Sequence, residues 1–231
     1  MCGRYTLTPE QKKIQAEFKV KPGHYVHEPR YNIAPSQPAP VIVREDENVM
    51  KMMKWGLVPY WAKDPKIGFK LINARAETIT EKPSFKTAFK KRRCLVPADG
   101  FYEWEKGQGK RVKIPHRFVL NSGKLFSFAG LWDIWQTPEG KPLETFTIIT
   151  TSPNELMKPI HDRMPVILHK EDEELWLDPG ANENALLSIL KPFESELMEE
   201  YEVSIKVNSP RDDSPECVNP TRNFPEQEPL L

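Results

Sequence analysis

Two short runs give the strongest evidence for the fold of this chain: Leu-Phe-Ser-Phe-Ala-Gly-Leu at residues 125–131 and Phe-Thr-Ile-Ile-Thr-Thr at residues 146–151. Both runs are short and rich in aromatic or β-branched residues, which is typical of β-strands. Similar runs recur along the chain, and turn-rich segments separate them without regularly spaced helices. This succession predicts an α+β fold that is mainly antiparallel, not a doubly wound parallel sheet. The other runs are 41–43, 71–73, 94–96, 118–120 and 201–207.

Local patterns add detail to this prediction. Residues 201–207 alternate apolar and polar side chains, which predicts a half-buried strand. Thr8 has the position of a helix N-cap, with Pro9 at the first helical position and Gln11 three residues after the cap. The buried face of that helix would hold Ile14 and Phe18.

Two more helices are predicted. The first covers residues 83–92, with Phe85 and Phe89 directed inward and a row of lysines directed outward, where they could face a polyanion. The second covers residues 184–190 and looks purely structural. The outward lysines of the first helix are Lys82, Lys86, Lys90 and Lys91.

Composition indicates a globular chain with one large domain. The 231 residues are 39% hydrophobic, and no apolar run approaches the roughly 18 residues that span a bilayer. Three unevenly spaced cysteines and the absence of a signal-peptide pattern favour a reducing, cytoplasmic setting with no structural metal and no cofactor. We expect one domain over 1–220 and a flexible tail over 221–231.

The net charge of zero hides two segments of opposite sign. Residues 51–93 contain 12 Lys and Arg against three Asp and Glu, whereas residues 171–231 contain four against 16. A basic segment of this kind could follow a phosphate backbone, or the two segments could neutralise each other in the fold. The sequence leaves both interpretations open.

The start of the chain, Met1-Cys2-Gly3-Arg4-Tyr5, carries the most specific chemistry. Removal of Met1 would leave a terminal cysteine whose amine, with a pKa of about 8, and thiol, of about 8.5, lie on adjacent carbons. Such an aminothiol can form a Schiff base with an aldehyde and then close a five-membered thiazolidine ring. The alternative is that Cys2 is merely a small apolar residue near a terminus.

Six segments together resemble the SRAP family, the SOS-response-associated peptidases or abasic-site processing proteins. The resemblance extends from Met1 to about Pro220, and it rests on all six segments in the same order. It implies a barrel-like SRAP fold with several peripheral helices. The segments are the Met-Cys-Gly-Arg start, 30–35 (RYNIAP), 55–61 (WGLVPYW), 73–78 (NARAET), 97–104 (PADGFYEW) and 160–165 (IHDRMP).

The resemblance implies a substrate, namely single-stranded DNA that carries an abasic site. The ring-opened abasic sugar presents an aldehyde at C1′, which is the group that a terminal aminothiol attacks. The family therefore implies a thiazolidine DNA-protein crosslink through Cys2 that shields the lesion. Reversal of the crosslink and strand cleavage by a lyase side reaction are further implied activities.

Matching the family's positions assigns the remaining roles. Glu103 and His161 match the two acid-base positions, and burial of Glu103 among aromatic residues would raise the pKa of its carboxyl. Asn73 and Arg75 lie two apart on a predicted strand and so share a face, where the family implies lesion sensing and a phosphate contact. The other DNA-binding candidates are Arg4 for phosphate and Trp55, Trp61 and Trp104 for base stacking, although at least one of these tryptophans is expected in the core.

Two other functions remain open from the sequence. Cys2, His161 and Glu103 could form the nucleophile, base and orienting group of a cysteine peptidase that also removes Met1. The chain could instead bind single-stranded DNA without chemistry, in which case Cys2 is incidental. The first alternative predicts turnover of ordinary peptides, and the second predicts equal binding of intact and abasic DNA.

Overall fold

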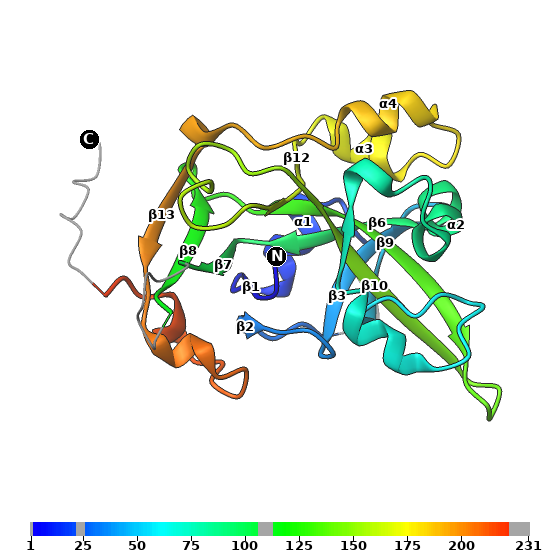
Figure 1. The fold of residues 1–231 in the computed structure, drawn as a ribbon, viewed down its shortest axis with the longest axis horizontal. Helices are drawn as coiled ribbons and strands as arrows, with labels where there is room; N and C mark the ends of the chain where they lie inside the picture. Colours follow the sequence, from blue (N-terminus) through cyan, green and yellow to red (C-terminus); the bar gives the residue numbers. More distant parts are fainter. Residues whose placement is uncertain (1, 22–25, 106–112, 222–231) are drawn as a thin grey trace.

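A computed structural model describes residues 2–21, 26–105 and 113–221. Five strands form a first sheet in the order β13-β8-β7-β1-β2, and each neighbouring pair is antiparallel. Figure 1 shows this sheet on the side of the molecule that carries β13. Its strands are β1 (Tyr5–Leu7), β2 (Arg30–Ile33), β7 (Gly100–Trp104), β8 (Pro115–Leu120) and β13 (Met198–Glu202).

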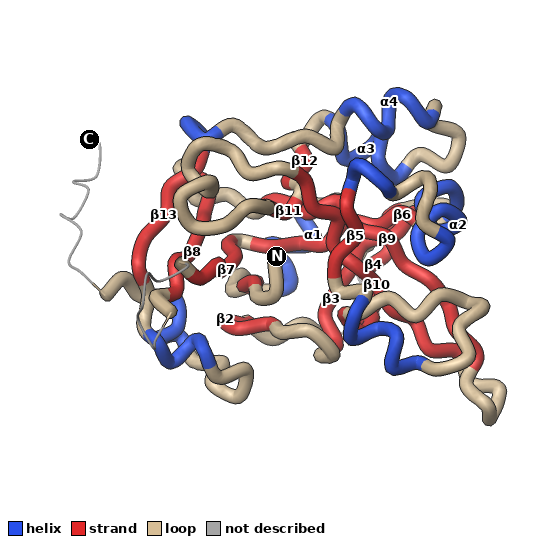
Figure 2. The backbone as a smooth tube through the Cα atoms, viewed as in Figure 1, coloured by secondary structure: helices blue, strands red, loops and turns tan. Residues whose placement is uncertain are grey.

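The second sheet closes on itself. Strand β10 pairs with β4, and the path continues through β3, β6 and β9 back to β10, so five strands form a ring. Only the pairings of β10 with β4 and β5 are parallel. The mainly antiparallel, barrel-like α+β fold predicted from the sequence is therefore confirmed (Figure 2). The strands are β3 (Pro38–Arg44), β4 (Asn48–Trp55), β5 (Asn73–Arg75), β6 (Arg93–Ala98), β9 (Phe126–Gln136), β10 (Pro142–Thr151), β11 (Met164–Pro165) and β12 (Ile167–Leu168).

Short helices lie at the periphery. Phe85 and Phe89 of α2 are buried and the lysines of its outer face are exposed, as predicted. The α-helices are α1 (Gln11–Glu17), α2 (Pro83–Lys91), α3 (Asp172–Leu177) and α4 (Glu183–Ser188). The 3-10 helices are η1 (Pro65–Lys70), η2 (Ala76–Thr78), η3 (Ser195–Leu197), η4 (Ile205–Asn208) and η5 (Pro215–Val218).

An aromatic cluster joins the two sheets. The Tyr5 ring of β1 lies 5.2 Å from the ring of Trp55 at the end of β4 and 5.8 Å from that of Phe128 in β9, in both cases edge to face. All three side chains are fully buried. Because Tyr5 is three residues from Cys2, this packing restricts the position of Cys2.

Two sequence predictions need correction. Helix α1 begins at Gln11, not after Thr8, because the Thr8 hydroxyl and amide donate to the Asp99 carboxylate. Strand β13 ends at Glu202, because the chain then turns into η4 at Ile205. In both cases a distant contact or a turn replaces the structure that the local pattern favours.

The segment after β13 folds back across the start of β2. The Asp213 carboxylate accepts hydrogen bonds from the backbone N–H groups of Tyr31 and Asn32, at 2.6 and 2.7 Å, and pairs with Arg30. Thr221 is still hydrogen-bonded to Glu202, and residues 222–231 of the predicted tail lie outside the described residues. Among ion pairs between described residues, none joins the basic segment 51–93 to the acidic segment 171–221.

Candidate functional site

Cys2 lies directly beside β7. The N–H of Tyr102 donates to the carbonyl of Arg4 at 2.9 Å, which extends the pairing of β1 with β7 toward the chain start. Cys2 is fully buried, and burial raises the pKa of its thiol far above the usual value, with a further rise caused by the negative charge of Glu103. The thiol is therefore neutral near pH 7, and the carboxyl group of Glu103 is an ionisable neighbour.

Glu103 has the buried environment that the sequence predicts. Glu103 lies on β7 and is only 3% exposed, and burial raises the pKa of its carboxyl group to about 7. The negative charge of Asp162 contributes to this rise, which places the segment around His161 near Glu103. A carboxyl group with this pKa can both give and take a proton near neutrality.

His161 lies in the loop before β11. Its Nδ1 accepts the backbone N–H of Arg163 at 3.0 Å, so the neutral ring carries its proton on Nε2. Asp162 Oδ1 lies 3.0 Å from the same nitrogen and can accept a hydrogen bond from it once the ring becomes charged. The imidazole is 17% exposed, so this group can exchange protons with a bound substrate or with solvent.

Strand pairing brings the segment of Asn73 and Arg75 close to β11, which follows the loop of His161. Strand β5 runs parallel to β10, with Arg75 opposite Thr150, and Thr150 in turn lies opposite Pro165 of β11. Among the described residues, the buried Oδ1 of Asn73 has no hydrogen-bond partner, so it can accept a bond from a ligand. The Arg75 side chain is exposed at the surface.

Two residues without a role in the sequence analysis connect these segments. Arg163 donates from both terminal nitrogens to the carboxylate of Glu77, and one nitrogen also donates to the Thr150 carbonyl at 2.6 Å. Both residues lie inside quoted segments, two positions after His161 and Arg75 respectively. That shared spacing is the signal that could have identified them.

Arg4 is partly committed to the fold. Its Nη1 donates to Asn32 Oδ1 at 2.8 Å and to the Val207 carbonyl at 2.6 Å, and its guanidinium carbon lies 5.5 Å from the centre of the Trp104 ring. The Trp104 Nε1 donates to Asn208 Oδ1 at 2.6 Å, and the side chain is half-buried. A phosphate contact by Arg4 and base stacking by Trp104 stay predictions.

Two of the candidate tryptophans differ in burial, because Trp55 lies in the core and Trp61 lies at the surface. Trp55 is fully buried, its Nε1 donates to the Ile72 carbonyl at 2.9 Å, and its ring stacks on Phe146. Burial excludes Trp55 from the base-stacking role predicted for it, and it is the core tryptophan that the alternative interpretation expected. Trp61 is 45% exposed and remains available for stacking.

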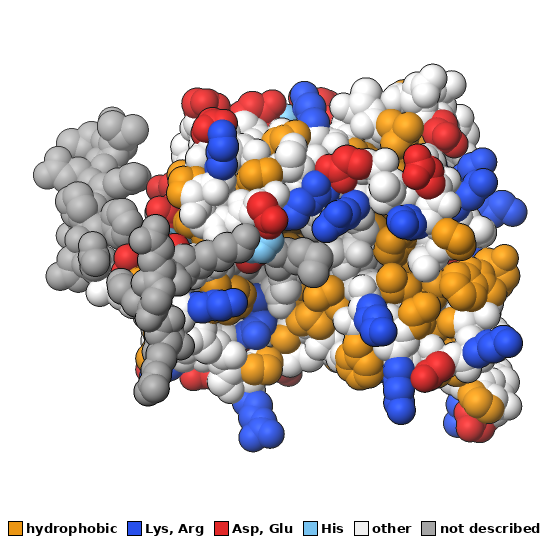
Figure 3. Space-filling view, in the orientation of Figure 1, with side chains coloured by type: hydrophobic (Ala, Val, Ile, Leu, Met, Phe, Trp, Pro, Cys, Tyr) orange, Lys and Arg blue, Asp and Glu red, His pale blue; other side chains and the backbone are white. Residues whose placement is uncertain are grey.

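Trp61 belongs to an exposed aromatic and basic surface. A hollow of about 300 Å³ is lined by Trp61 and three lysines of the η1 region, and none of these lysines forms an ion pair with a described residue. The nearby Tyr60 and Phe69 are 55% and 64% exposed. Figure 3 shows Lys and Arg side chains beside hydrophobic ones on this face of the molecule. The lysines are Lys63, Lys66 and Lys70, and we call this set, with Tyr60, Trp61 and Phe69, the η1 surface.

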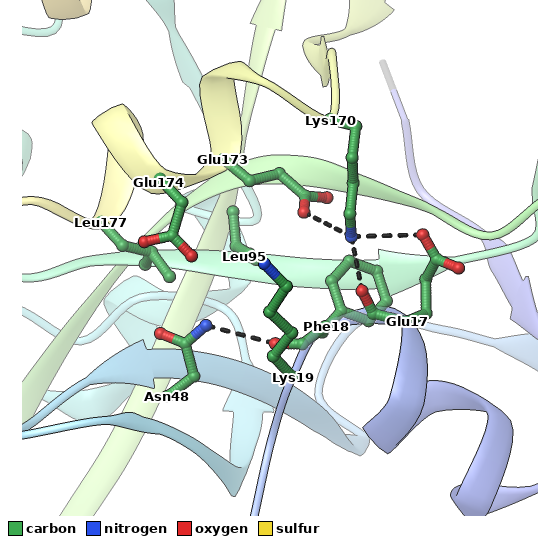
Figure 4. Close-up of a pocket in the computed structure, with 9 residues that line it drawn as sticks. All are labelled: Glu17, Phe18, Lys19, Asn48, Leu95, Lys170, Glu173, Glu174 and Leu177. Carbon is green, nitrogen blue, oxygen red and sulfur yellow. Dashed lines mark hydrogen bonds and ion pairs between the residues drawn. The ribbon is translucent and has the colours of Figure 1, made fainter.

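A second hollow, of about 90 Å³, is lined by none of the candidate site residues (Figure 4). Lys170 lies between Glu17 of α1 and Glu173 of α3, at 3.2 and 2.8 Å from their carboxylates. The other oxygen of Glu173 accepts the Ser127 hydroxyl at 2.8 Å. Because these polar groups satisfy one another, the cluster joins α1 to α3 and we assign it a structural role.

Neither a metal cluster nor a membrane-spanning helix is found in the described part of the chain. There, no group of three or more His, Cys, Asp or Glu side chains is arranged to hold a metal ion. No described helix is long and apolar enough to cross a bilayer. All three cysteines are buried as free thiols.

Known proteins share this sequence and fold. The abasic site processing protein YoqW of Bacillus subtilis is 51% identical over 224 residues, which cover 94% of this chain and 99% of the relative. The abasic site processing protein HMCES of Xenopus tropicalis is 33% identical, covering 94% of this chain and 78% of the relative. A crystal structure of a protein from Bacteroides thetaiotaomicron superposes with a TM-score of 0.88 at 32% identity, covering 96% of this chain and 100% of that one.

The family assignment follows from these similarities and from the sequence model of one family. That model, described as SOS response associated peptidase (SRAP), matches residues 1–210. The matched range contains every candidate site residue described above. The chain therefore belongs to the SOS response associated peptidase family, and its similarity to the abasic site processing proteins supports a role in processing abasic sites in DNA.

Proposed function

We propose that this protein traps abasic sites in single-stranded DNA as a thiazolidine through Cys2, after removal of Met1. The observation that carries the proposal is the position of Cys2 against Glu103, a buried carboxyl group whose pKa lies at about 7. Two relatives named abasic site processing proteins support the choice of lesion. The product shields the lesion aldehyde from strand cleavage.

The chemistry needs two bond-forming steps. The free amine of Cys2 attacks C1′ of the open sugar, and the resulting carbinolamine loses water to give a Schiff base. The Cys2 sulfur then bonds to the same carbon while the thiol proton moves to the nitrogen. The sum is one aldehyde and one aminothiol giving one thiazolidine and one water.

Glu103 and His161 supply the proton transfers. Protonated Glu103 can give a proton to the departing hydroxyl, and the carboxylate can then take the proton of the Cys2 thiol. His161, with its proton on Nε2, is suited to assist opening of the sugar ring. Run in reverse, the same transfers by Glu103 would reopen the ring and release DNA.

The raised pKa of the Cys2 thiol favours this sequence over peptidase chemistry. Cysteine peptidases attack with a thiolate and depend on a thiol pKa that is lowered by a neighbouring cation. Here burial and the Glu103 carboxylate act in the opposite direction. An imine that forms first needs only a neutral thiol beside a base, and the raised pKa values of Cys2 and Glu103 support that requirement.

Strand binding is assigned to the residues around this centre. Asn73 would contact the lesion through its buried Oδ1, and Arg75 and Arg4 would contact phosphates. Trp104 and the η1 surface would supply stacking faces and additional positive charge. Binding of this kind tolerates any base sequence and weakens as salt rises.

The deciding experiment mixes protein with single-stranded DNA that carries one abasic site and resolves the products on a denaturing gel. We expect a heat-stable shifted band with wild type, no stable band with Cys2→Ala and at most a labile one with Cys2→Ser. Cys94→Ala is the matched control, because Cys94 is another buried thiol and should be dispensable. A stable band from Cys2→Ala, or from protein whose terminal mass shows an intact Met1, would refute the proposal.

Reversal is tested on a preformed adduct. Excess unlabelled abasic DNA is added, and release of the labelled strand is followed. Glu103→Gln should slow release, and an unchanged rate would remove Glu103 from that step. Strand scission by the Cys2→Ala or Cys2→Ser variants would reveal the lyase side reaction.

A further inference from the structure

A row of ionisable side chains crosses the first sheet next to Glu103. Glu103 of β7 lies opposite His116 of β8, and His116 lies opposite Glu202 of β13. Directly opposed residues of antiparallel strands share a face of the sheet, with Cβ atoms about 4.5–5.5 Å apart. The Phe101 and Phe118 rings, one pair further along on that same face, stack at 5.1 Å and show this geometry directly.

His116 is buried with one ring nitrogen engaged. Its Nδ1 lies 2.8 Å from Glu200 Oε2, so in the neutral ring Nδ1 carries the proton and donates it to that carboxylate. Its Nε2 is buried and has no hydrogen-bond partner among the described residues. A buried acceptor without a partner is costly and calls for an explanation.

We propose that His116 is a positioning residue that carries protons between Glu103 and Glu200. This inference rests on the proposed function, in which Glu103 gives and takes protons. In the step, the O–H bond of Glu103 breaks as its proton moves to His116 Nε2, and the Nδ1 proton moves to Glu200 Oε2. One proton is transferred, no group is oxidised, and a change of the Glu103 side-chain torsions brings the two groups into contact.

Burial explains why Glu103 needs such a route. The residue is 3% exposed, and a bound lesion would cover it further, whereas the Glu200 side chain is 30% exposed and meets solvent. Three carboxyl groups surround the route, because His116 faces Glu103 from β7 and both Glu200 and Glu202 from β13. Cys2 and Asp162 also interact electrostatically with Glu103.

The test compares His116→Phe with His169→Phe. His169 is a matched control, because its ring also pairs with a glutamate, Glu194, at 3.0 Å, and stacks on a phenylalanine away from the site. Adduct formation is measured in single turnover at saturating abasic DNA from pH 5.5 to 8.5. We expect His116→Phe to slow the reaction about tenfold and to leave the DNA affinity unchanged. The effect is smaller than the roughly 10²–10⁴-fold effect of a group in direct proton transfer, because His116 acts through Glu103.

A second pair of measurements separates proton transfer from packing. Imidazole added to His116→Ala should restore much of the rate, and imidazole added to His169→Ala should change nothing. The inference is overturned if His116→Phe forms the adduct at the wild-type rate at every pH. It is also overturned if His116→Ala is slow and added imidazole does not restore its rate. A loss of rate that only follows lost DNA affinity or a lowered melting temperature also overturns it.

A titration without DNA keeps this inference distinct from the proposed function. Carboxyl carbon NMR of labelled protein should follow the titration of Glu103, and His116→Phe should move the pH at which that titration occurs. If wild type makes no adduct, the proposed function fails whatever this titration shows. If wild type makes the adduct but Glu103 titrates identically in His116→Phe, only the relay fails.

Discussion

Arg163 holds the carboxylate of Glu77 with both terminal nitrogens, at 2.6 and 2.9 Å. The pair joins the segment that carries Asn73 and Arg75 to the loop that carries His161. The Arg163 hydrogen bonds lower the pKa of the Glu77 carboxyl below its usual range. Two segments whose paired residues are 86 positions apart in the sequence are thereby held together.

Breaking this pair should harm activity more than stability. We expect Glu77→Gln to lower the free energy of unfolding by about 1 kcal/mol or less, because the Glu77 side chain is 51% exposed and solvent screens the pair. Crosslinking at saturating DNA should slow several-fold, because the loop of His161 loses its anchor. Urea unfolding and single-turnover kinetics measure the two effects, with the exposed Glu155→Gln as control. Equal losses in both variants would contradict the anchoring role.

The raised pKa of Glu103 makes stability depend on pH. The folded protein holds the Glu103 proton up to a pKa of about 7, against an ordinary value of 4.5, so folding favours the protonated form. The contribution of Glu103 to stability is therefore largest below the unfolded value and is lost as pH rises from about 4.5 to 7. The loss should be on the order of 1–3 kcal/mol.

Glu103→Gln should remove this part of the pH dependence. The variant stays neutral at every pH, so we expect it to be more stable than wild type at pH 8 and close to wild type at pH 4.5. Urea unfolding at the two pH values measures the difference. Parallel pH profiles for the two proteins would show that Glu103 ionises in the folded state as readily as in the unfolded one.

The two tryptophans of the 55–61 segment should behave in opposite ways. Trp55→Ala removes a fully buried ring and should cost about 3–5 kcal/mol of stability. Trp61→Ala should leave the melting temperature nearly unchanged and weaken single-stranded DNA binding by about 1–3 kcal/mol. Thermal melts and fluorescence anisotropy separate the effects. Unchanged affinity in Trp61→Ala would exclude Trp61 from the strand path.

The η1 surface predicts a specific salt response. Replacing Lys63, Lys66 and Lys70 with glutamine should lower the slope of log affinity against log salt by about 0.7 for each phosphate that the protein no longer neutralises, or about 2 for all three. The corresponding replacements at Lys82, just before α2, and at Lys86 and Lys90 of α2 provide a control with the same change of charge. Equal slopes in both triple variants would mean that the weaker salt response reflects net charge and not a strand path over η1.

Elements in which residue spacing and polarity agree could be predicted from the sequence. Helix α2 was predictable because Phe85 and Phe89 are four residues apart and lysines occupy its other face. The prediction from sequence failed where a distant residue replaces the local hydrogen-bond partner. Thr8 resembles an N-cap, but Asp99, 91 residues later, takes its hydroxyl and amide. Nothing local distinguishes Trp55, which became core, from Trp61, which stayed exposed.

The chemical groups that are available can be read from the sequence alone, because an aminothiol at Cys2 and a carboxyl flanked by aromatic residues are properties of neighbouring atoms. How those groups behave depends on the folded structure. Desolvation and charge act through space, so the pKa of Glu103 depends first on burial and also on Asp162, a residue 59 positions away in the sequence. Strand register likewise placed His116 opposite Glu103, and no spacing along the chain encodes that pairing.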